Sequence, residues 1–195
     1  MTLREQAVKN LLDFDKLMKK YQINYFLMDG TLLGLYRDGD LIAGDYDDID
    51  VGMTESDWKK ISQNTKIFKE EGFQMFKSFV LNQNQEGMSI KRWANHIDIF
   101  LVHKNKEKGE AFNLGRNCCR LGSREYMAYV YPLECFEKFN SLQFEGIEFV
   151  IPSETDKFLS ARYNEDWKKP HLRTEGFNMC SVEQNKALKG DYDYE

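Results

Sequence analysis

The stretch "GDYDDIDVGM", residues 44–53, places four aspartates within six residues. Its second half alternates polar and apolar residues, which is typical of a β-strand with two unlike faces. Side chains two residues apart on a strand point to the same face, so Asp48 and Asp50 are predicted to lie side by side. Two neighbouring carboxylates repel each other unless a cation lies between them. The stretch therefore predicts a strand that carries a cation site.

A third carboxylate is expected from "HIDIFLV", residues 96–102, a short apolar run with Asp98 near its start. A buried carboxylate without a partner costs several kcal/mol, so Asp98 should meet a basic residue or a metal. Three carboxylates on neighbouring strands would hold one or two Mg²⁺ ions, or Mn²⁺ in their place. An EF-hand is excluded, because no frame places Gly at position 6 and Glu at position 12 of the loop.

The upstream stretch "FLMDGTLLGLY", residues 26–36, is predicted to form a strand, a tight turn and a helix. It shares Asp-Gly-Thr with haloacid-dehalogenase phosphatases, but Leu27 stands where their nucleophilic aspartate would be. Gly30 would let the backbone approach a ligand, and a helix beginning near Thr31 would offer free N–H groups to a phosphate. The alternative is that Gly30 and Thr31 only make the turn.

The composition is that of one soluble domain: 195 residues, 42% hydrophobic and 30% charged. A net charge of -5 disfavours nonspecific nucleic-acid binding. The first ten residues are charged where a signal peptide would be apolar, and no run approaches the roughly 18 apolar residues of a membrane span. We therefore predict a cytoplasmic protein. The four cysteines lack paired Cys-x-x-Cys spacing, which predicts reduced structural thiols.

Periodicity predicts the remaining elements. A capping box at Thr2 and Glu5 begins a long amphipathic helix. A helix is expected over residues 58–68, strands over 73–81, 88–93 and 96–104, and no confident element over 104–124. "SLQFEGIEFVIP", residues 141–152, predicts a hairpin that turns at Glu145-Gly146. Ser153 or Asp156 is expected to cap a further helix.

Four segments together resemble the LicD/fukutin-related family: "DGTLLGLYRDGDLI" (29–42), "DDIDVGM" (47–53), "HIDIF" (96–100) and the block "FEGIEFVIPSETDKFLSARYNEDWKKP" (144–170). The resemblance implies an α/β (α+β) fold, with a nucleotidyltransferase-like mixed sheet flanked by helices in a single domain. That domain would span residues 1–170, with an N-terminal helix (1–22), a metal and phosphate core (23–103) and a LicD-like C-terminal part (104–170). A polar tail, 171–195, would follow.

The resemblance also implies a function. It is Mg-dependent transfer of a phosphorylated alcohol, such as phosphocholine or a polyol phosphate, from a CDP-linked donor to a glycan hydroxyl, as in lipopolysaccharide or teichoic acid modification. Carried over to this sequence, the metal-binding and catalytic residues would be Asp48, Asp50 and Asp98. The donor phosphates would be met by Gly30, Thr31 and Arg37. Lys91 and Arg92 are further substrate-binding candidates or ordinary surface charges, and Asp45 or Asp47 could supply another metal ligand.

Two other functions fit the same residues. One is a nucleotidyltransferase that moves NMP from an NTP to a small-molecule hydroxyl, such as that of an antibiotic, and the block 144–170 argues against it. The other is a non-catalytic binding protein, which the presence of all three carboxylates disfavours. His96 and His103 are expected to be solvated strand ends. Tyr126, Tyr129 and Tyr131 either line an acceptor pocket or occupy half-buried strand positions.

Overall fold

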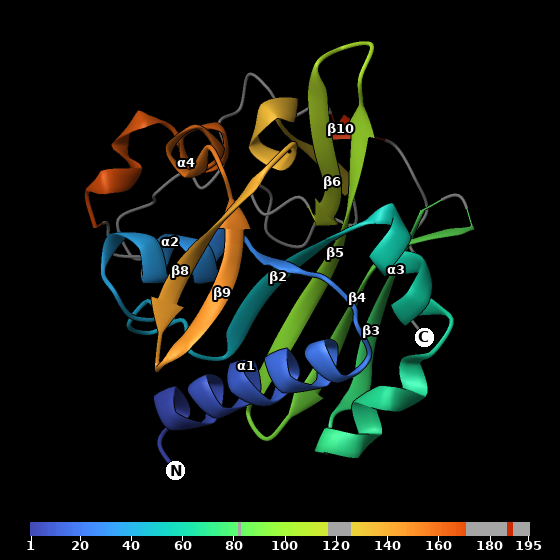
Figure 1. The fold of residues 1–195 in the computed structure, drawn as a ribbon, viewed down its shortest axis with the longest axis vertical. Helices are drawn as coiled ribbons and strands as arrows, with labels where there is room; N and C mark the ends of the chain where they lie inside the picture. The colour runs from blue at the N-terminus through green and yellow to red at the C-terminus, as the bar shows by residue number, and fades with distance from the viewer. Residues whose placement is uncertain (82, 117–125, 171–186, 189–195) are drawn as a thin grey trace.

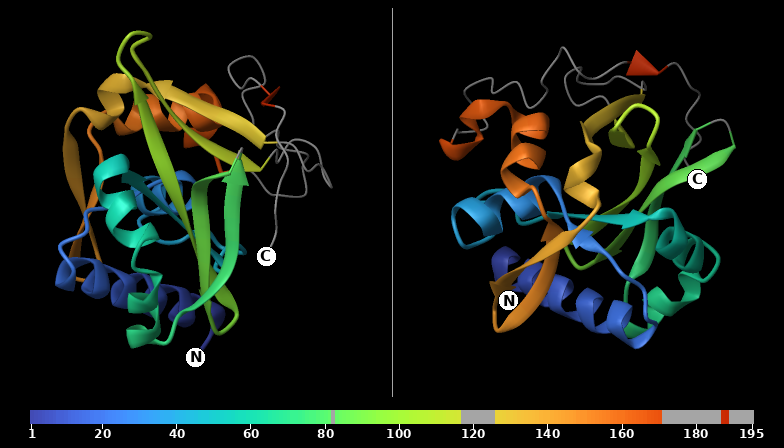
Figure 2. Two further views of the ribbon diagram at one scale, coloured as in Figure 1. Left: turned by 90° about the vertical axis from the view of Figure 1, so that its right-hand side faces the viewer. Right: turned by 45° about the horizontal axis from the view of Figure 1, so that its top comes forward.

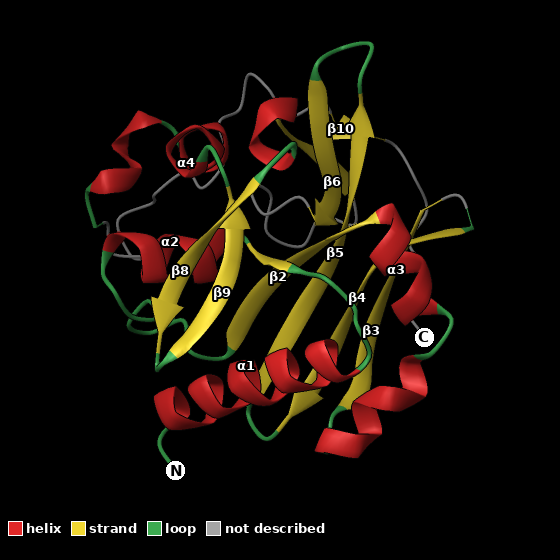
Figure 3. Ribbon diagram, viewed as in Figure 1, coloured by secondary structure: helices red, strands yellow, loops and turns green. Residues whose placement is uncertain are grey.

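The computed structural model describes residues 1–81, 83–116, 126–170 and 187–188, and it is a mixed sheet flanked by helices (Figure 1, Figure 3). Its helices are α1 Leu3–Lys20, α2 Asp29–Arg37, α3 Glu55–Ser62, α4 Thr155–Tyr163 and the 3-10 helices η1 Thr65–Glu71, η2 Leu133–Phe136 and η3 Glu165–Lys168. Its strands are β1 Phe26–Leu27, β2 Asp48–Thr54, β3 Gln74–Leu81, β4 Asn84–Arg92, β5 Asn95–Asn105, β6 Glu110–Arg116, β7 Tyr126–Pro132, β8 Phe139–Phe144, β9 Ile147–Pro152 and β10 Ala187–Leu188. The predicted fold class is confirmed.

Helix α1 begins at the predicted capping box. The Thr2 hydroxyl accepts from the Glu5 N–H, and the Glu5 carboxylate accepts from the Thr2 N–H. One side of the helix is fully buried, including Leu11 and Phe14. Helices α1 and α3 pack against β2 and β5 and so cover one face of the sheet (Figure 2, left). The apolar stripe of α1 therefore packs into the main hydrophobic core.

Strand β5 is the centre of the sheet. It pairs in parallel with β2 on one side, and on the other side it pairs antiparallel first with β4 and then with β6. Ile49, Val51, Ile97 and Ile99 alternate with polar residues along β2 and β5 and are completely buried. These apolar side chains face the helices, which leaves the intervening polar side chains on the opposite face.

The predicted hairpin is β8 and β9, which form a separate two-stranded sheet beside β1. Glu145 and Gly146 at its turn have φ angles of 48° and 76°. Two successive positive φ values are typical of the type I′ turn, whose twist matches that of the strands it joins. The hairpin prediction is confirmed, including its turn residues.

Other boundaries differ from the predictions. The segment expected as one helix over residues 58–68 is divided into α3 and η1, and Gly72 ends η1 with φ 77°. Ser153 does not cap α4: its hydroxyl donates to the Glu134 carbonyl, and the N-cap position belongs to Glu154. Strands β6 and β10 were not predicted, and β10 pairs with β7 from within the expected tail.

Candidate functional site

Four polar side chains form a two-by-two array on β2 and β5. The parallel register pairs Asp48 with His96 and Asp50 with Asp98. On each strand the two residues are two positions apart, so their side chains point the same way. All four side chains therefore share the face opposite α1. The prediction that the three carboxylates share one face is confirmed. His96 was expected to be a solvated strand end, but it lies inside the array.

Part of this array has the geometry of a metal-binding group. One ligand atom from each of Asp48, His96 and Asp98 lies within 4.8 Å of the other two. The His96 Nε2 atom is 3.2 Å from Asp48 Oδ1 and 3.7 Å from Asp98 Oδ1. Two carboxylates and an imidazole are ligands that divalent cations such as Mn²⁺ and Zn²⁺ accept, and Mg²⁺ favours the carboxylates. The residues present therefore fit a divalent ion.

Electrostatics also favour a cation here. Burial, together with the neighbouring Asp48 charge, raises the pKa of Asp98 to about 6, although His96 and the Ser89 hydroxyl, which donates to Asp98, oppose the rise. Burial disfavours a charged His96, but the hydrogen bond to Asp48 and the two carboxylate charges outweigh it and raise the pKa of His96. Positive charge near these carboxylates would therefore stabilise their charged form, and a metal ion would supply it.

Asp50 is half-buried and contacts the first turn of α2. Its Oδ2 atom accepts a hydrogen bond from the Gly30 N–H at 3.0 Å, and its own N–H donates to Thr31 Oγ1 at 2.9 Å. Burial, and then the charges of Asp48, Asp29 and Asp98, hold the pKa of Asp50 well above its ordinary value. Gly30 and Thr31, predicted to meet a phosphate, thus join the first turn of α2 to the carboxylate array.

Gly30 is closely packed against acidic groups. A Cβ atom at this position would lie 3.3 Å from Asp50 Oδ2 and 3.4 Å from Asp45 Oδ2. The glycine therefore allows two carboxylates to approach the backbone. Asp45 is placed beside the array, whereas the Asp47 side chain is exposed. Whether either is a metal ligand stays open as a prediction.

Asp29, whose role the sequence left open, forms a buried ion pair that sequence reasoning missed. Its Oδ1 atom is 3.1 Å from Arg162 Nε, and both side chains are 8% exposed. The Tyr131 hydroxyl is 3.4 Å from the same oxygen, and the guanidinium lies 4.2 Å from the centre of the Tyr129 ring. Both tyrosines are buried, so their strand positions serve packing, while the Tyr126 side chain lies outside the description. Arg162 thus connects α4 to the start of α2.

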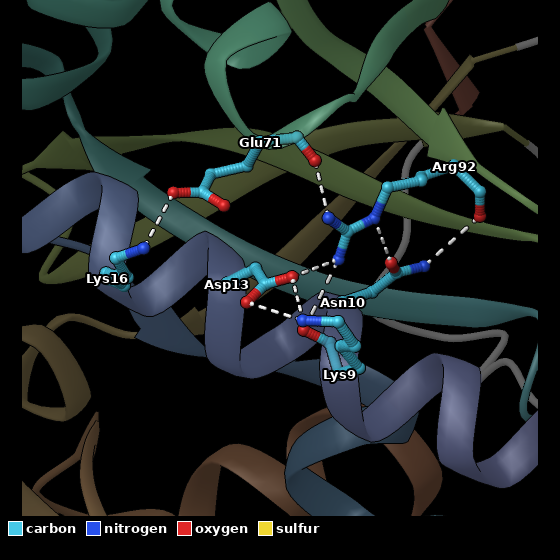
Figure 4. A network of polar contacts seen from close by, with 6 residues as sticks. All are labelled: Lys9, Asn10, Asp13, Lys16, Glu71 and Arg92. Carbon is cyan, nitrogen blue, oxygen red and sulfur yellow. Dashed lines mark hydrogen bonds and ion pairs between the residues drawn. The ribbon is translucent and has the colours of Figure 1, made fainter.

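Both arginines that were predicted to bind substrate have protein partners. Arg37 donates to the Trp167 carbonyl at 3.1 Å and to the Asp38 carboxylate at 2.7 and 2.8 Å. Arg92 joins β4 to α1 and η1 through Asn10, Asp13 and the Glu71 carbonyl (Figure 4). Substrate binding by either arginine stays a prediction, and the network around Arg92 argues against that role.

Lys91 lies on the other side of β4 from Arg92, because adjacent strand residues point to opposite faces. It is paired in register with His96 and is exposed. Its ammonium group is 4.7 Å from the centre of the Phe76 ring. The structure therefore brings Lys91, but not Arg92, to the array.

Comparison with known proteins identifies the family. Residues 22–154 match the family described as LicD/FKTN/FKRP, nucleotidyltransferase domain. The chain belongs to this family. The match contains the whole array, from the first turn of α2 to β5, and the resemblance inferred from the motifs is thereby confirmed.

Individual relatives are distant. The chain is 30% identical over 157 residues to Uncharacterized protein RP689 of Rickettsia prowazekii, covering 80% of this chain and 53% of that protein. It is 23% identical over 191 residues to Uncharacterized protein T07A5.1 of Caenorhabditis elegans, covering 95% and 48%. It is 25% identical over 173 residues to the mouse Ribitol-5-phosphate transferase FKTN, covering 87% and 35%. The chain thus spans about half of these relatives or less.

None of the helices in the described part of the chain combines the length and the apolar character needed to cross a bilayer. The family's description names a nucleotidyltransferase domain, and the mouse relative is named a ribitol-5-phosphate transferase. The identity of donor, acceptor and metal goes beyond these findings.

Proposed function

We propose that this protein is a metal-dependent phosphotransferase that moves a phosphorylated alcohol from a CDP-linked donor to a hydroxyl group of a glycan or small molecule. The observation that carries the proposal is the parallel register of β2 and β5, which gathers Asp48, Asp50, His96 and Asp98 on one face of the sheet. The similarity to a ribitol-5-phosphate transferase supports a polyol phosphate as the transferred group, ahead of phosphocholine.

The metal would be held by Asp48, Asp98 and His96, with Asp50 as a further carboxylate beside Asp98. Mg²⁺ or Mn²⁺ bound there would offset the negative charge that develops on the phosphate oxygens during transfer. The chain's own contribution is to fix these ligands on two hydrogen-bonded strands and to shield Asp50 and Asp98 partly from water. A preorganised, partly buried site of this kind strengthens electrostatic stabilisation.

In the proposed reaction, the acceptor oxygen forms a bond to the phosphorus that carries the alcohol. The bond between that phosphorus and the bridging oxygen of the diphosphate breaks, and CMP leaves with the electron pair. The acceptor proton passes to a carboxylate of the array, for which half-buried Asp50, with its raised pKa, is the best placed. No protein side chain becomes covalently attached to phosphate, in keeping with Leu27 at the end of β1.

The first turn of α2 would position the donor rather than react with it. Gly30 and Thr31 are bonded to Asp50, and the first turn of α2 directs its positive dipole end to the same place. Donor phosphate contacts by Gly30, Thr31 and Arg37 belong to this proposal. For Arg37, such a contact would require it to turn away from Asp38.

A donor screen tests the proposed function. The protein is incubated with Mg²⁺ and CDP-ribitol, CDP-glycerol, CDP-choline, CTP or ATP, and binding is followed by thermal shift and by release of CMP or inorganic diphosphate. We expect a CDP-linked polyol together with Mg²⁺ to raise the melting temperature more than either alone. Asp48→Asn should remove this synergy, whereas Lys66→Met, an exposed substitution on η1, should retain it. Response to NTPs alone would favour NMP transfer and contradict the proposal.

A further inference from the structure

Strand β3, which is separated from β5 by β4, contains a bulge near the site. Its register pairs Met75 with Ile90 and Lys77 with Ser89, so Phe76 is an extra residue between two consecutive pairs. A bulge of this kind turns two neighbouring side chains toward one face of the sheet. Lys77 shares the site face because its partner Ser89 donates a hydrogen bond to Asp98. Phe76 shares that face too, with its ring 5.7 Å from the His96 ring.

The bulge brings two cations to one aromatic ring. The ammonium nitrogens of Lys77 and Lys91 lie 4.5 and 4.7 Å from the centre of the Phe76 ring, which is 38% exposed. Over the residues that the structure describes, neither ammonium group forms an ion pair within 4.0 Å. Two like charges gathered at one exposed ring repel each other, so an anion that bridges them would be stabilised.

The position of these cations relates them to the metal group. Lys91 is the register partner of His96, and Lys77 lies close enough to lower the pKa of both His96 and Asp98 through its charge. Without a metal, the two lysines partly offset the carboxylates of the array. Once a divalent cation neutralises those carboxylates, the lysine charges are left without compensation. The surface should then attract an anion more strongly in the metal-bound protein than in the metal-free one.

We propose that Lys77, Lys91 and Phe76 form a subsite for the diphosphate of a nucleoside diphosphate-linked donor, adjacent to the metal ligands. One phosphate of the donor reaches the metal group, and the other lies between the two ammonium groups on β3 and β4. Phe76 holds the lysine side chains apart and in place by cation–π contacts. The subsite recognises the diphosphate, which all such donors share, and the inference rests on the proposed function.

Binding measurements on single-site variants test this subsite. Isothermal titration calorimetry measures the affinities of CDP, inorganic diphosphate and cytidine for wild type, Lys77→Met, Lys91→Met and Phe76→Leu. Each titration is made with Mg²⁺ and with chelator. Lys66→Met is the matched control, because it removes the same charge from an exposed position on η1. This helix packs against α1 and β3. Lys77→Arg and Lys91→Arg keep the charge and report on folding together with circular dichroism.

We expect each Lys→Met variant to bind CDP and inorganic diphosphate about tenfold more weakly when Mg²⁺ is present. This factor corresponds to the loss of about one charge-assisted contact. The Arg variants and Lys66→Met should stay close to wild type. With chelator, the differences should shrink, because the carboxylates then compete for the lysines.

Four outcomes would overturn the inference, and the last two separate its failure from that of the proposed function. CDP binding by both Lys→Met variants at wild-type affinity would exclude the two lysines. Equal weakening of CDP and cytidine by Phe76→Leu, without loss in the lysine variants, would mean that the ring stacks on the base instead. If wild type binds CDP and turns over a CDP-linked donor while the lysine variants are unaffected, only the subsite fails. If wild type binds neither CDP nor diphosphate with Mg²⁺, the proposed function fails with it.

Discussion

Replacing Arg92 with methionine should destabilise the protein without affecting donor binding. The Arg92 side chain is 10% exposed and lies 2.6 Å from Asp13 Oδ2, which belongs to a side chain 15% exposed. It also donates to Asn10 Oδ1 at 2.8 Å and to the Glu71 carbonyl (Figure 4). In addition, it stacks over the rings of Phe73 and Trp93. The guanidinium thereby joins β4, α1 and η1.

The cost can be worked out from these contacts. Removing one partner of a buried ion pair costs about 3–5 kcal/mol, because the other charge is left in a poorly solvated place. Asp13 keeps a second partner, Lys9, at 2.9 Å, and methionine preserves part of the packing against the two rings. We therefore expect Arg92→Met to lower the free energy of unfolding by about 2–3 kcal/mol at pH 7.

The effect should depend on pH in a defined direction. Burial opposes the charged form of Asp13, but hydrogen bonds from Lys9 and Arg92 outweigh it and lower the pKa of Asp13. A carboxyl whose folded-state pKa is lowered contributes stability above its unfolded pKa of about 3.9, and this contribution is lost as the pH falls through the folded-state pKa. The difference between wild type and Arg92→Met should therefore narrow below about pH 4.

Urea unfolding followed by circular dichroism at pH 7 and pH 3 measures both effects. Lys9→Met is the control, because Lys9 is 51% exposed and should cost less than about 1 kcal/mol. Calorimetry with CDP and Mg²⁺ gives the functional comparison. The reasoning would be refuted by an Arg92→Met protein that is as stable as wild type, and more so if it has lost affinity for CDP.

Three other substitutions test the site from different sides. Asp98→Asn should abolish stabilisation by Mg²⁺ in thermal shift. Without metal it should raise the free energy of unfolding at pH 7 by up to about 3 kcal/mol, because a folded-state pKa of about 6 disfavours the charged carboxyl as the pH rises above 4. An equal change in the free energy of unfolding at pH 4 and pH 7 would contradict this explanation. Gly52→Ala should cost about 1–3 kcal/mol in urea unfolding, because its Cβ would overlap the Phe26 ring; a neutral effect would show that the ring can move aside. Arg162→Gln should cost about 3–5 kcal/mol by leaving Asp29 buried and unpaired, and a loss below about 1 kcal/mol would contradict that role.

Local rules were sufficient for much of the site. Alternation along residues 48–51 placed Asp48 and Asp50 on one face, and an apolar run identified Asp98 as the third member. The capping box at Thr2 and the Glu145-Gly146 turn were also readable, because each depends on residues close in sequence. Such features are predictable since their physical cause lies within a few residues.

Features that depend on tertiary pairing were not readable. His96 enters the array only because β2 and β5 pair in one parallel register, which no local pattern specifies. Arg162 gains its role from burial opposite Asp29, more than a hundred residues away. The bulge at Phe76 likewise interrupts an alternation that would otherwise have placed its ring on the other face. Lys91 and Arg92 could have been separated from sequence, since neighbours on a strand cannot serve the same face.

The parallel pairing of β2 with β5 also has a consequence for folding. Between these strands the chain forms α3, η1, β3 and β4, so Asp50 meets Asp98 only after a long crossover has closed. Contacts of such high sequence separation form slowly, because the entropy of loop closure is lost before the contact stabilises the chain. A refolding chain should therefore capture Mn²⁺ only late, and the time course of metal capture would report when the centre of the sheet has formed.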